Sequence, residues 1–136
     1  MSDQLARLAV GDTFGPIERE PLSTRQLVEY AGASLDFNRV HYDEPFARAG
    51  GHPSVIAHGM LSMAFMGQAV AALCGGPAPI TELQARFKAV AYPGDVLRVS
   101  GRVAARTERA LELELEARRA DGTVIATGRA SLRLGG

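Results

Sequence analysis

The sequence is poor in cysteine and in net charge. Its 136 residues include a single cysteine, Cys74, so no disulfide can form within the chain. The N-terminus shows no secretory pattern, and together these features predict a reducing, cytoplasmic location. Fifteen basic and fifteen acidic side chains cancel. The chain therefore lacks the basic field that holds a phosphate backbone, and we expect no nucleic-acid partner.

Charge is missing altogether from residues 56–74, where the few polar side chains are those of His58, Ser62 and Gln68. The length approaches the about 20 apolar residues that a membrane span requires. However, Gly59 and Gly67 interrupt the stretch, and no lysine or arginine flanks it. We therefore expect no membrane partner and predict a helix that protein covers on every side.

The chain also lacks repeats, linkers and low-complexity tracts. With 46% hydrophobic residues it is rich enough to bury a core. We expect one domain over residues 1–136.

Residues before the apolar stretch predict one short strand, at 12–20, and two helices. Ser23 has the character of an N-cap, and Gln26 lies three positions later, so a helix is expected from there to about Gly32. Asp43 is expected to cap a second, short helix with Pro45 in its first turn.

Residues after the apolar stretch predict strands. Runs of strand-forming residues are separated by the turn signals YPGD and ADGT, and we expect strands at 81–92, 96–106, 111–117 and 124–134. Glutamates at 112, 114 and 116 oppose Arg129 and Arg133 as a solvated outer face. The inner face of the last strand is small at its centre, at Ala126, Gly128 and Ala130. The pattern predicts an α+β fold in which an antiparallel sheet wraps around one long central helix.

The stretch SLDFNRVHYD places two aspartates, an asparagine and a histidine within eight positions: Asp36, Asn38, His41 and Asp43. Asp, Asn and His are poor strand formers, so a strand is not expected here. From the residues alone, a polar loop that caps the next helix is the simpler interpretation. A catalytic pair held against apolar neighbours is the alternative.

The motif YAGASLDFNRVHYD followed by IAHGMLSMAFM resembles the MaoC-like (R)-specific enoyl-thioester hydratases and 3-hydroxyacyl-thioester dehydratases. The VGDTF opening and the RFKAVAYPGD hairpin strengthen the resemblance, which covers nearly the whole chain. It implies a single hot-dog domain, with Asp36 and His41 as the catalytic pair. It also implies that Gly59 supplies a backbone amide to the thioester oxygen.

Three positions depart from the family pattern. Leu35 stands where a glycine or small polar residue is common, and Arg39 replaces a frequent proline. Gly67 stands where several relatives carry a serine. If the gap at Gly67 opens toward the acyl chain, longer substrates are favoured; if it faces the sheet, Gly67 is a packing residue.

Further residues are expected around the substrate. Asn38 is assigned to orient the water or the Asp36 carboxylate, and His58 to bind substrate or to form a hydrogen bond in the core beside the site. Met60 and Met63, with Phe65 or Met66, are expected to form the floor of an acyl pocket. Tyr30 and Tyr92 are expected to be core and turn residues.

No metal site is expected, because the separations between His41, His52, His58 and Cys74 match no compact zinc spacing. No cofactor is expected either.

The implied reaction is (R)-specific hydration of trans-2-enoyl thioesters, or the reverse dehydration, on an acyl-CoA or acyl-ACP substrate. Histidine suits both proton transfers, because it titrates near neutrality. The alternative is the catalytic subunit of a heterodimeric 3-hydroxyacyl-ACP dehydratase. A thioesterase and a non-catalytic acyl-binding subunit are less supported. A homodimer is the default assembly, and a heterodimer with a second hot-dog subunit is the alternative.

Overall fold

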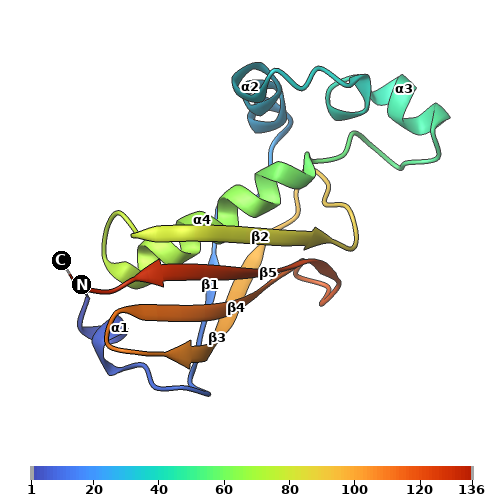
Figure 1. Cartoon of the computed structure of the whole chain (residues 1–136). Helices are drawn as coiled ribbons and strands as arrows, with labels where there is room; N and C mark the ends of the chain where they lie inside the picture. Colours follow the sequence, from blue (N-terminus) through green and yellow to red (C-terminus); the bar gives the residue numbers. More distant parts are fainter. Residues whose placement is uncertain (1, 136) are drawn as a thin grey trace.

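Five antiparallel strands form one sheet in the computed structural model of the chain, which describes residues 2–135. The strand order is β1 (Thr13–Glu18), β3 (Arg98–Arg106), β4 (Ala110–Arg118), β5 (Val124–Arg133) and β2 (Ile80–Phe87). The helix α4 (Gly59–Cys74) runs along one face of this sheet, as Figure 1 shows. This is the predicted hot-dog architecture.

Alternation along the strands builds the inner face of the sheet. Leu111, Leu113 and Leu115 of β4 are buried, as their period of two predicts. The partners of Leu113 and Leu115 on β5 are the small residues Ala130 and Gly128, and α4 packs where those side chains are missing. A β-carbon on Gly128 would lie 3.1 Å from Sδ of Met66, which is fully buried. The prediction that small residues admit the central helix is confirmed.

The outer face of the sheet carries the predicted charges. Glu114 pairs with Arg129 in the register of β4 and β5, and Arg102 of β3 forms an ion pair of 2.7 Å with Glu114. Both side chains of that ion pair are half exposed, so it contributes little to stability.

The strand predicted over residues 81–92 is shorter in the structure. β2 ends at Phe87 because its partner β5 begins at Val124, and the amides of Lys88 and Ala89 both donate to the carbonyl of Ile125. The chain then leaves the sheet, and Ala91 accepts a hydrogen bond of 2.8 Å from Ala57 N–H. Residues 88–92 thereby support the loop that enters α4.

The interpretation of RFKAVAYPGD as a hairpin is also wrong. The strands on either side of it, β2 and β3, do not pair, because β5 and β4 lie between them. The prolyl-glycyl turn is present, closed by a hydrogen bond from Asp95 N–H to Tyr92 O of 3.0 Å. It redirects a crossover connection.

The helices outside the sheet are α1 (Asp3–Arg7), α2 (Thr24–Ser34), the 3-10 turn η1 (Arg39–His41) and α3 (Glu44–Ala49). The predicted caps are present: Ser23 accepts from Gln26 N–H and Asp43 from Phe46 N–H, each at 3.1 Å. α2 continues past Gly32, the predicted end, as far as Ser34. Leu35 then ends it in the left-handed region with φ of 58°.

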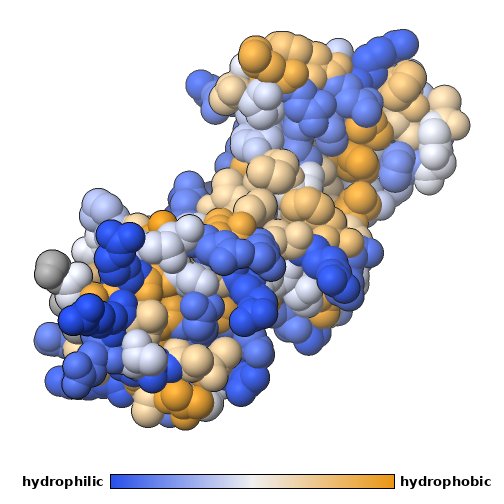
Figure 2. All heavy atoms as spheres, in the orientation of Figure 1, coloured by the Kyte–Doolittle hydropathy of each residue, from blue (hydrophilic) through white to orange (hydrophobic). Residues whose placement is uncertain are grey.

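The segment that contains α2, η1 and α3 lies beyond one end of the sheet, next to the first turn of α4 (Figure 1). In the space-filling view, hydrophobic surface covers the junction between this segment and α4 (Figure 2). Within residues 2–135, no helix combines the length and the apolar character that crossing a bilayer requires.

Candidate active site

The loop between α2 and α3 is shaped by two hydrogen bonds from the backbone to side chains two residues away. Asp36 Oδ1 accepts from Asn38 N–H at 3.3 Å, and Asn38 Oδ1 accepts from Val40 N–H at 3.1 Å. Asn38 therefore caps η1, the turn that carries His41. Its oxygen holds this turn, and its amide nitrogen can donate to a water or a substrate.

Asp36 and His41, the predicted pair, face one another. Oδ2 of Asp36 lies 3.7 Å from Nε2 of His41. His41 is 8% exposed, whereas half of the Asp36 side chain is open to solvent. The pair thus combines one buried and one accessible member.

A main-chain carbonyl orients the His41 ring. Nδ1 of His41 lies 2.8 Å from the oxygen of Ile56, which can only accept a hydrogen bond. Nδ1 therefore carries the proton, and in the neutral ring Nε2 presents its lone pair toward Asp36. Two acceptors at 3.7 Å do not bond to each other, but a water beside them can donate one O–H to each.

His58 lies behind this pair as the N-cap residue of α4. Its ring stacks on that of His41, with centroids 3.6 Å apart and planes 19° from parallel, and it meets Tyr30 edge-on at 4.8 Å. Nε2 of His58 donates to the main-chain oxygen of Asp36 at 3.3 Å. His58 is 2% exposed, so a substrate can contact it only if the residues that cover it move.

Burial lowers the pKa of His58 below its ordinary value of 6.5, although the hydrogen bond to Asp36 O opposes this. A charge on the neighbouring His41 lowers the pKa of His58 further, and the Asp36 carboxylate raises it. His58 is therefore neutral near pH 7, with its proton on Nε2. Nδ1 of His58 is the one buried side-chain nitrogen or oxygen in residues 2–135 that has no hydrogen-bond partner.

Gly59 begins α4, where the first amides of a helix have no partner within the helix. The ring of Phe87, at the end of β2, lies against it, and a β-carbon on Gly59 would be 3.3 Å from this ring. Phe87 is 48% exposed and Gly59 is exposed too, so their contact lies at the surface. The sequence interpretation missed Phe87, although its place on the inner face of β2 after Leu83 and Ala85 could have signalled it.

The residues expected to form the floor of the acyl pocket divide into two pairs. Met60 is 55% exposed and Met63 is half-buried, so both are accessible to a ligand. Phe65 and Met66 are buried in the core, and their expected role in lining the pocket is not supported. A β-carbon on Gly67 would lie 3.6 Å from Leu83 of β2, so Gly67 faces the sheet.

Asp36, His41 and His58 bring atoms able to bind a metal within 4.8 Å of one another. The two imidazoles are stacked, however, and the lone pairs of an imidazole lie in its ring plane. Nearly parallel rings direct these lone pairs side by side and not to a common point. This geometry is unlike the tetrahedral arrangement that zinc prefers.

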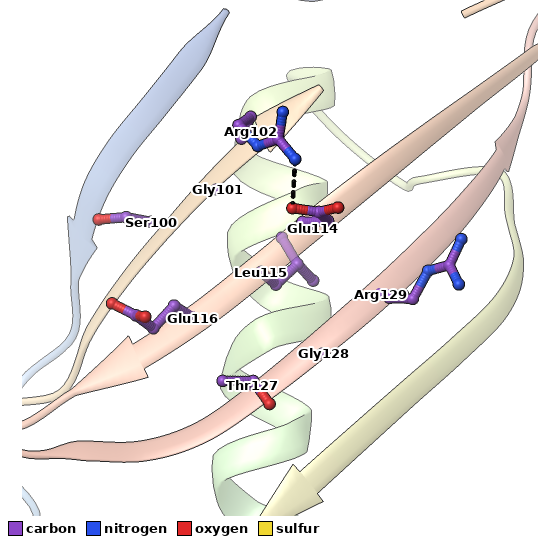
Figure 3. A pocket seen from close by; sticks show the side chains of 9 residues that line it. All are labelled: Ser100, Gly101, Arg102, Glu114, Leu115, Glu116, Thr127, Gly128 and Arg129. Atoms are coloured by element: carbon purple, nitrogen blue, oxygen red, sulfur yellow. Dashed lines mark hydrogen bonds and ion pairs between the residues drawn. The ribbon is translucent and has the colours of Figure 1, made fainter. Parts of the chain in front are cut away.

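A large depression lies elsewhere, on the outer face of the sheet (Figure 3). It has a volume of about 590 Å³, and polar and charged side chains of β3, β4 and β5 surround it, among them Arg102, Glu114 and Arg129. None of the residues of the Asp36–His41 pair lines it. A smaller pocket of about 240 Å³, which includes Val28, Tyr42 and Val55, reaches His41.

Comparison with known proteins finds a family model and relatives that match this chain in sequence, and solved structures that match it in fold. A family model described as a MaoC like domain matches residues 6–122. The chain is 33% identical over 66 residues to "Enoyl-CoA hydratase 2, peroxisomal" of Arabidopsis thaliana, a match that covers 47% of this chain and 21% of that protein. It is 38% identical over 66 residues to the "Peroxisomal hydratase-dehydrogenase-epimerase" of Saccharomyces cerevisiae, covering 48% of this chain and 7% of that protein.

The chain thus spans a small part of the length of these curated relatives. Among solved structures, an R-hydratase from Pseudomonas aeruginosa superposes with a TM-score of 0.84 at 27% identity. That superposition covers 96% of this chain and 85% of the other.

Proposed function

The chain belongs to the MaoC-like domain family, and from that premise we propose that it catalyses the (R)-specific hydration of trans-2-enoyl thioesters or the reverse dehydration. The observation that carries the proposal is the orientation of His41. The carbonyl of Ile56 holds Nδ1, so that Nε2 is directed at Asp36. A water can then meet two proton acceptors at once.

In the proposed hydration, Asp36 and His41 hold one water on one face of the substrate double bond. The pair removes a proton from this water as its oxygen adds to the β-carbon. The same pair returns a proton to the α-carbon on that face. The balance is one O–H bond and the C=C π bond broken, and one C–O and one C–H bond formed. Positioned acid-base catalysis of this kind contributes about 10²–10⁴-fold.

Negative charge develops on the thioester oxygen during this step. We assign its stabilisation to the amide of Gly59, because the first turn of α4 carries unpaired N–H groups and the positive end of the helix dipole. One such donor is worth about 2.7–4 kcal/mol in other enzymes. The exposed Met60 and half-buried Met63 are assigned to the acyl chain, and Asn38 to the water.

The assembly we propose is a dimer. Edge strand β2 has a partner on one side only within this chain. Large apolar side chains are exposed near the site, among them Phe37, Tyr42 and Phe87. Light scattering at micromolar concentration should give twice the mass of the 14.4 kDa chain. An active preparation with the mass of one chain would contradict the dimer.

A homodimer is the default. Two solved structures of the same fold are titled as complexes of two different proteins, and activity that requires a second subunit would favour the heterodimeric dehydratase.

For the location, a single cysteine favours a reducing compartment such as the cytoplasm, whereas the names of both curated relatives place those proteins in peroxisomes.

The direct test is an assay of the purified protein with short and long trans-2-enoyl thioesters, each on CoA and on an acyl carrier protein. We expect formation of the (R)-3-hydroxy product, and loss of kcat by about 10²–10⁴-fold in Asp36→Asn and in His41→Ala. Glu29→Gln on α2 removes an exposed carboxylate as a control and should keep full activity. Retention of most activity in either site variant would remove the pair from the mechanism.

A further inference from the structure

His58 has contacts that suit a structural support of the pair better than a residue that touches substrate. It is 2% exposed, it stacks on His41, and its Nε2 bonds to the main chain of Asp36. It therefore contacts both members of the pair, which come from different parts of one loop. It also sits at the first turn of α4, next to Gly59.

We propose that His58 is a positioning residue, whose imidazole holds the His41 ring by stacking and the Asp36 main chain by a hydrogen bond. The inference rests on the proposed function, because the pair it positions is the one assigned to proton transfer. A rigid pair matters, because displacement of reacting groups by about 1 Å costs on the order of 10²-fold in rate.

The groups around His58 keep it suited to this role. The titratable side chains that face it are His41 from η1, Asp36 from the preceding loop and Tyr30 from α2. The positive end of the α4 dipole disfavours a second positive charge at the N-cap. Because His58 is neutral, it adds no charge beside His41. Protons then exchange with solvent on the exposed side of the Asp36–His41 pair.

The hydrogen-bonding state of His58 follows from the same contacts. Nε2 faces a carbonyl and must donate, so the lone pair is on Nδ1. Since Nδ1 has no partner in the described residues, the bond through Nε2 and the two ring contacts are what hold this side chain. The two imidazoles of the stack therefore carry opposite tautomers, Nδ1–H in His41 and Nε2–H in His58.

Three variants separate the stack from the hydrogen bond. His58→Phe keeps a flat ring and loses the donor, His58→Gln keeps a donor near the Nε2 position and loses the ring, and His58→Ala loses both. We expect kcat to fall by about tenfold in the first two and by about 100-fold in the third, with KM within about threefold of the unmodified protein. His52→Gln, in the loop before Ser54, is the matched control and should change neither.

Nitrogen-15 NMR of histidine-labelled protein supplies a readout that needs no substrate. We expect the Nε2–H form for His58 at pH 7 and a proton on Nδ1 of His41, and we expect His58→Phe to change the His41 signals. Unchanged kcat in His58→Phe, a raised KM at unchanged kcat, or a doubly protonated His58 would each overturn the proposal. If the unmodified protein hydrates no enoyl thioester, the proposed function fails, and the NMR result alone decides whether His58 positions His41.

Discussion

The ring of Phe87 lies 3.3 Å from the point where a β-carbon of Gly59 would stand. β2 thus ends directly over the first residue of α4, and the two together form the margin of the candidate site. This contact with the Phe87 ring favours glycine at position 59, because a larger residue would press its β-carbon against the ring. A side chain there would have to share the space above the helix amide with an aromatic ring and with the substrate.

The first prediction concerns this position. Gly59→Ala should lower kcat/KM by about 10²-fold, the scale of losing one oxyanion donor, because the methyl group obstructs approach to the amide. The free energy of unfolding should change by less than about 1 kcal/mol, since the half-exposed Phe87 ring can move aside.

Steady-state kinetics and urea unfolding check both parts of this prediction. Gly76→Ala is the matched control, because a β-carbon at Gly76 meets nothing within 4 Å. In Gly59→Ala/Phe87→Ala the loss should persist. Full recovery in that double variant would assign the effect to the displaced ring.

The second prediction concerns Gly67 inside α4. A β-carbon at Gly67 would lie 3.6 Å from Leu83, an ordinary van der Waals contact, so Gly67→Ala should fit. It should raise the free energy of unfolding by about 1 kcal/mol through helix propensity. Gly67→Leu should overfill this contact and lower stability by about 1–3 kcal/mol. Both variants should keep the acyl chain-length profile of the unmodified protein. A profile shifted toward short chains in Gly67→Leu would return Gly67 to the acyl pocket.

The third prediction is the dependence of stability on pH. Folding lowers the pKa of His58, so as pH falls the unfolded chain binds a proton at this histidine before the folded chain does. The contribution of His58 is therefore complete above about pH 6.5 and is lost as pH falls toward the lower folded value. Urea unfolding at pH 8, 7, 6 and 5 should show this loss, and it should be weaker in His58→Phe. An equal loss in both proteins would assign the acid sensitivity to other groups.

The fourth prediction concerns Leu35, a β-carbon-bearing residue held at φ of 58°. The left-handed region costs such residues about 1–2 kcal/mol, and asparagine tolerates it better. Leu35→Asn should therefore be more stable than Leu35→Ala by about 1 kcal/mol, because alanine keeps the backbone strain while both lose the apolar side chain. Thermal unfolding of the two variants side by side measures this difference. Equal stability would show that the strain is relieved elsewhere.

The sheet and the central helix were predictable because their patterns are local. The leucines of β4 alternate strictly, and residues 56–74 carry no charge. In each element, the element's own residues therefore indicate which side chains are buried. The crossover between β2 and β3 was missed because a turn signal specifies a change of direction and not the partner of the next strand. The strand that pairs with β2 is β5, whose partner residues lie 39 to 52 positions later in the chain.

At the site, Asp36 and His41 were predicted from a motif, but the groups that orient them were not. The Ile56 carbonyl carries no side-chain signal, and the stack of His58 on His41 joins residues 17 positions apart through the start of α4. The departure at Leu35 from a common glycine was visible in the sequence. That this residue ends α2 in the left-handed region could be seen only from the backbone of the structure.

The segment that carries Asp36 and His41 lies beyond the end of the sheet, and its helices pack mainly on the turn between them. Regions with few buried contacts open independently of the rest of a protein. Amides of α2 and α3 should therefore exchange their hydrogens through local opening at a lower free energy than those of β4, which is hydrogen-bonded to a strand on each side. In the proposed function, such a segment can therefore open to admit a bulky thioester without any movement of the strands.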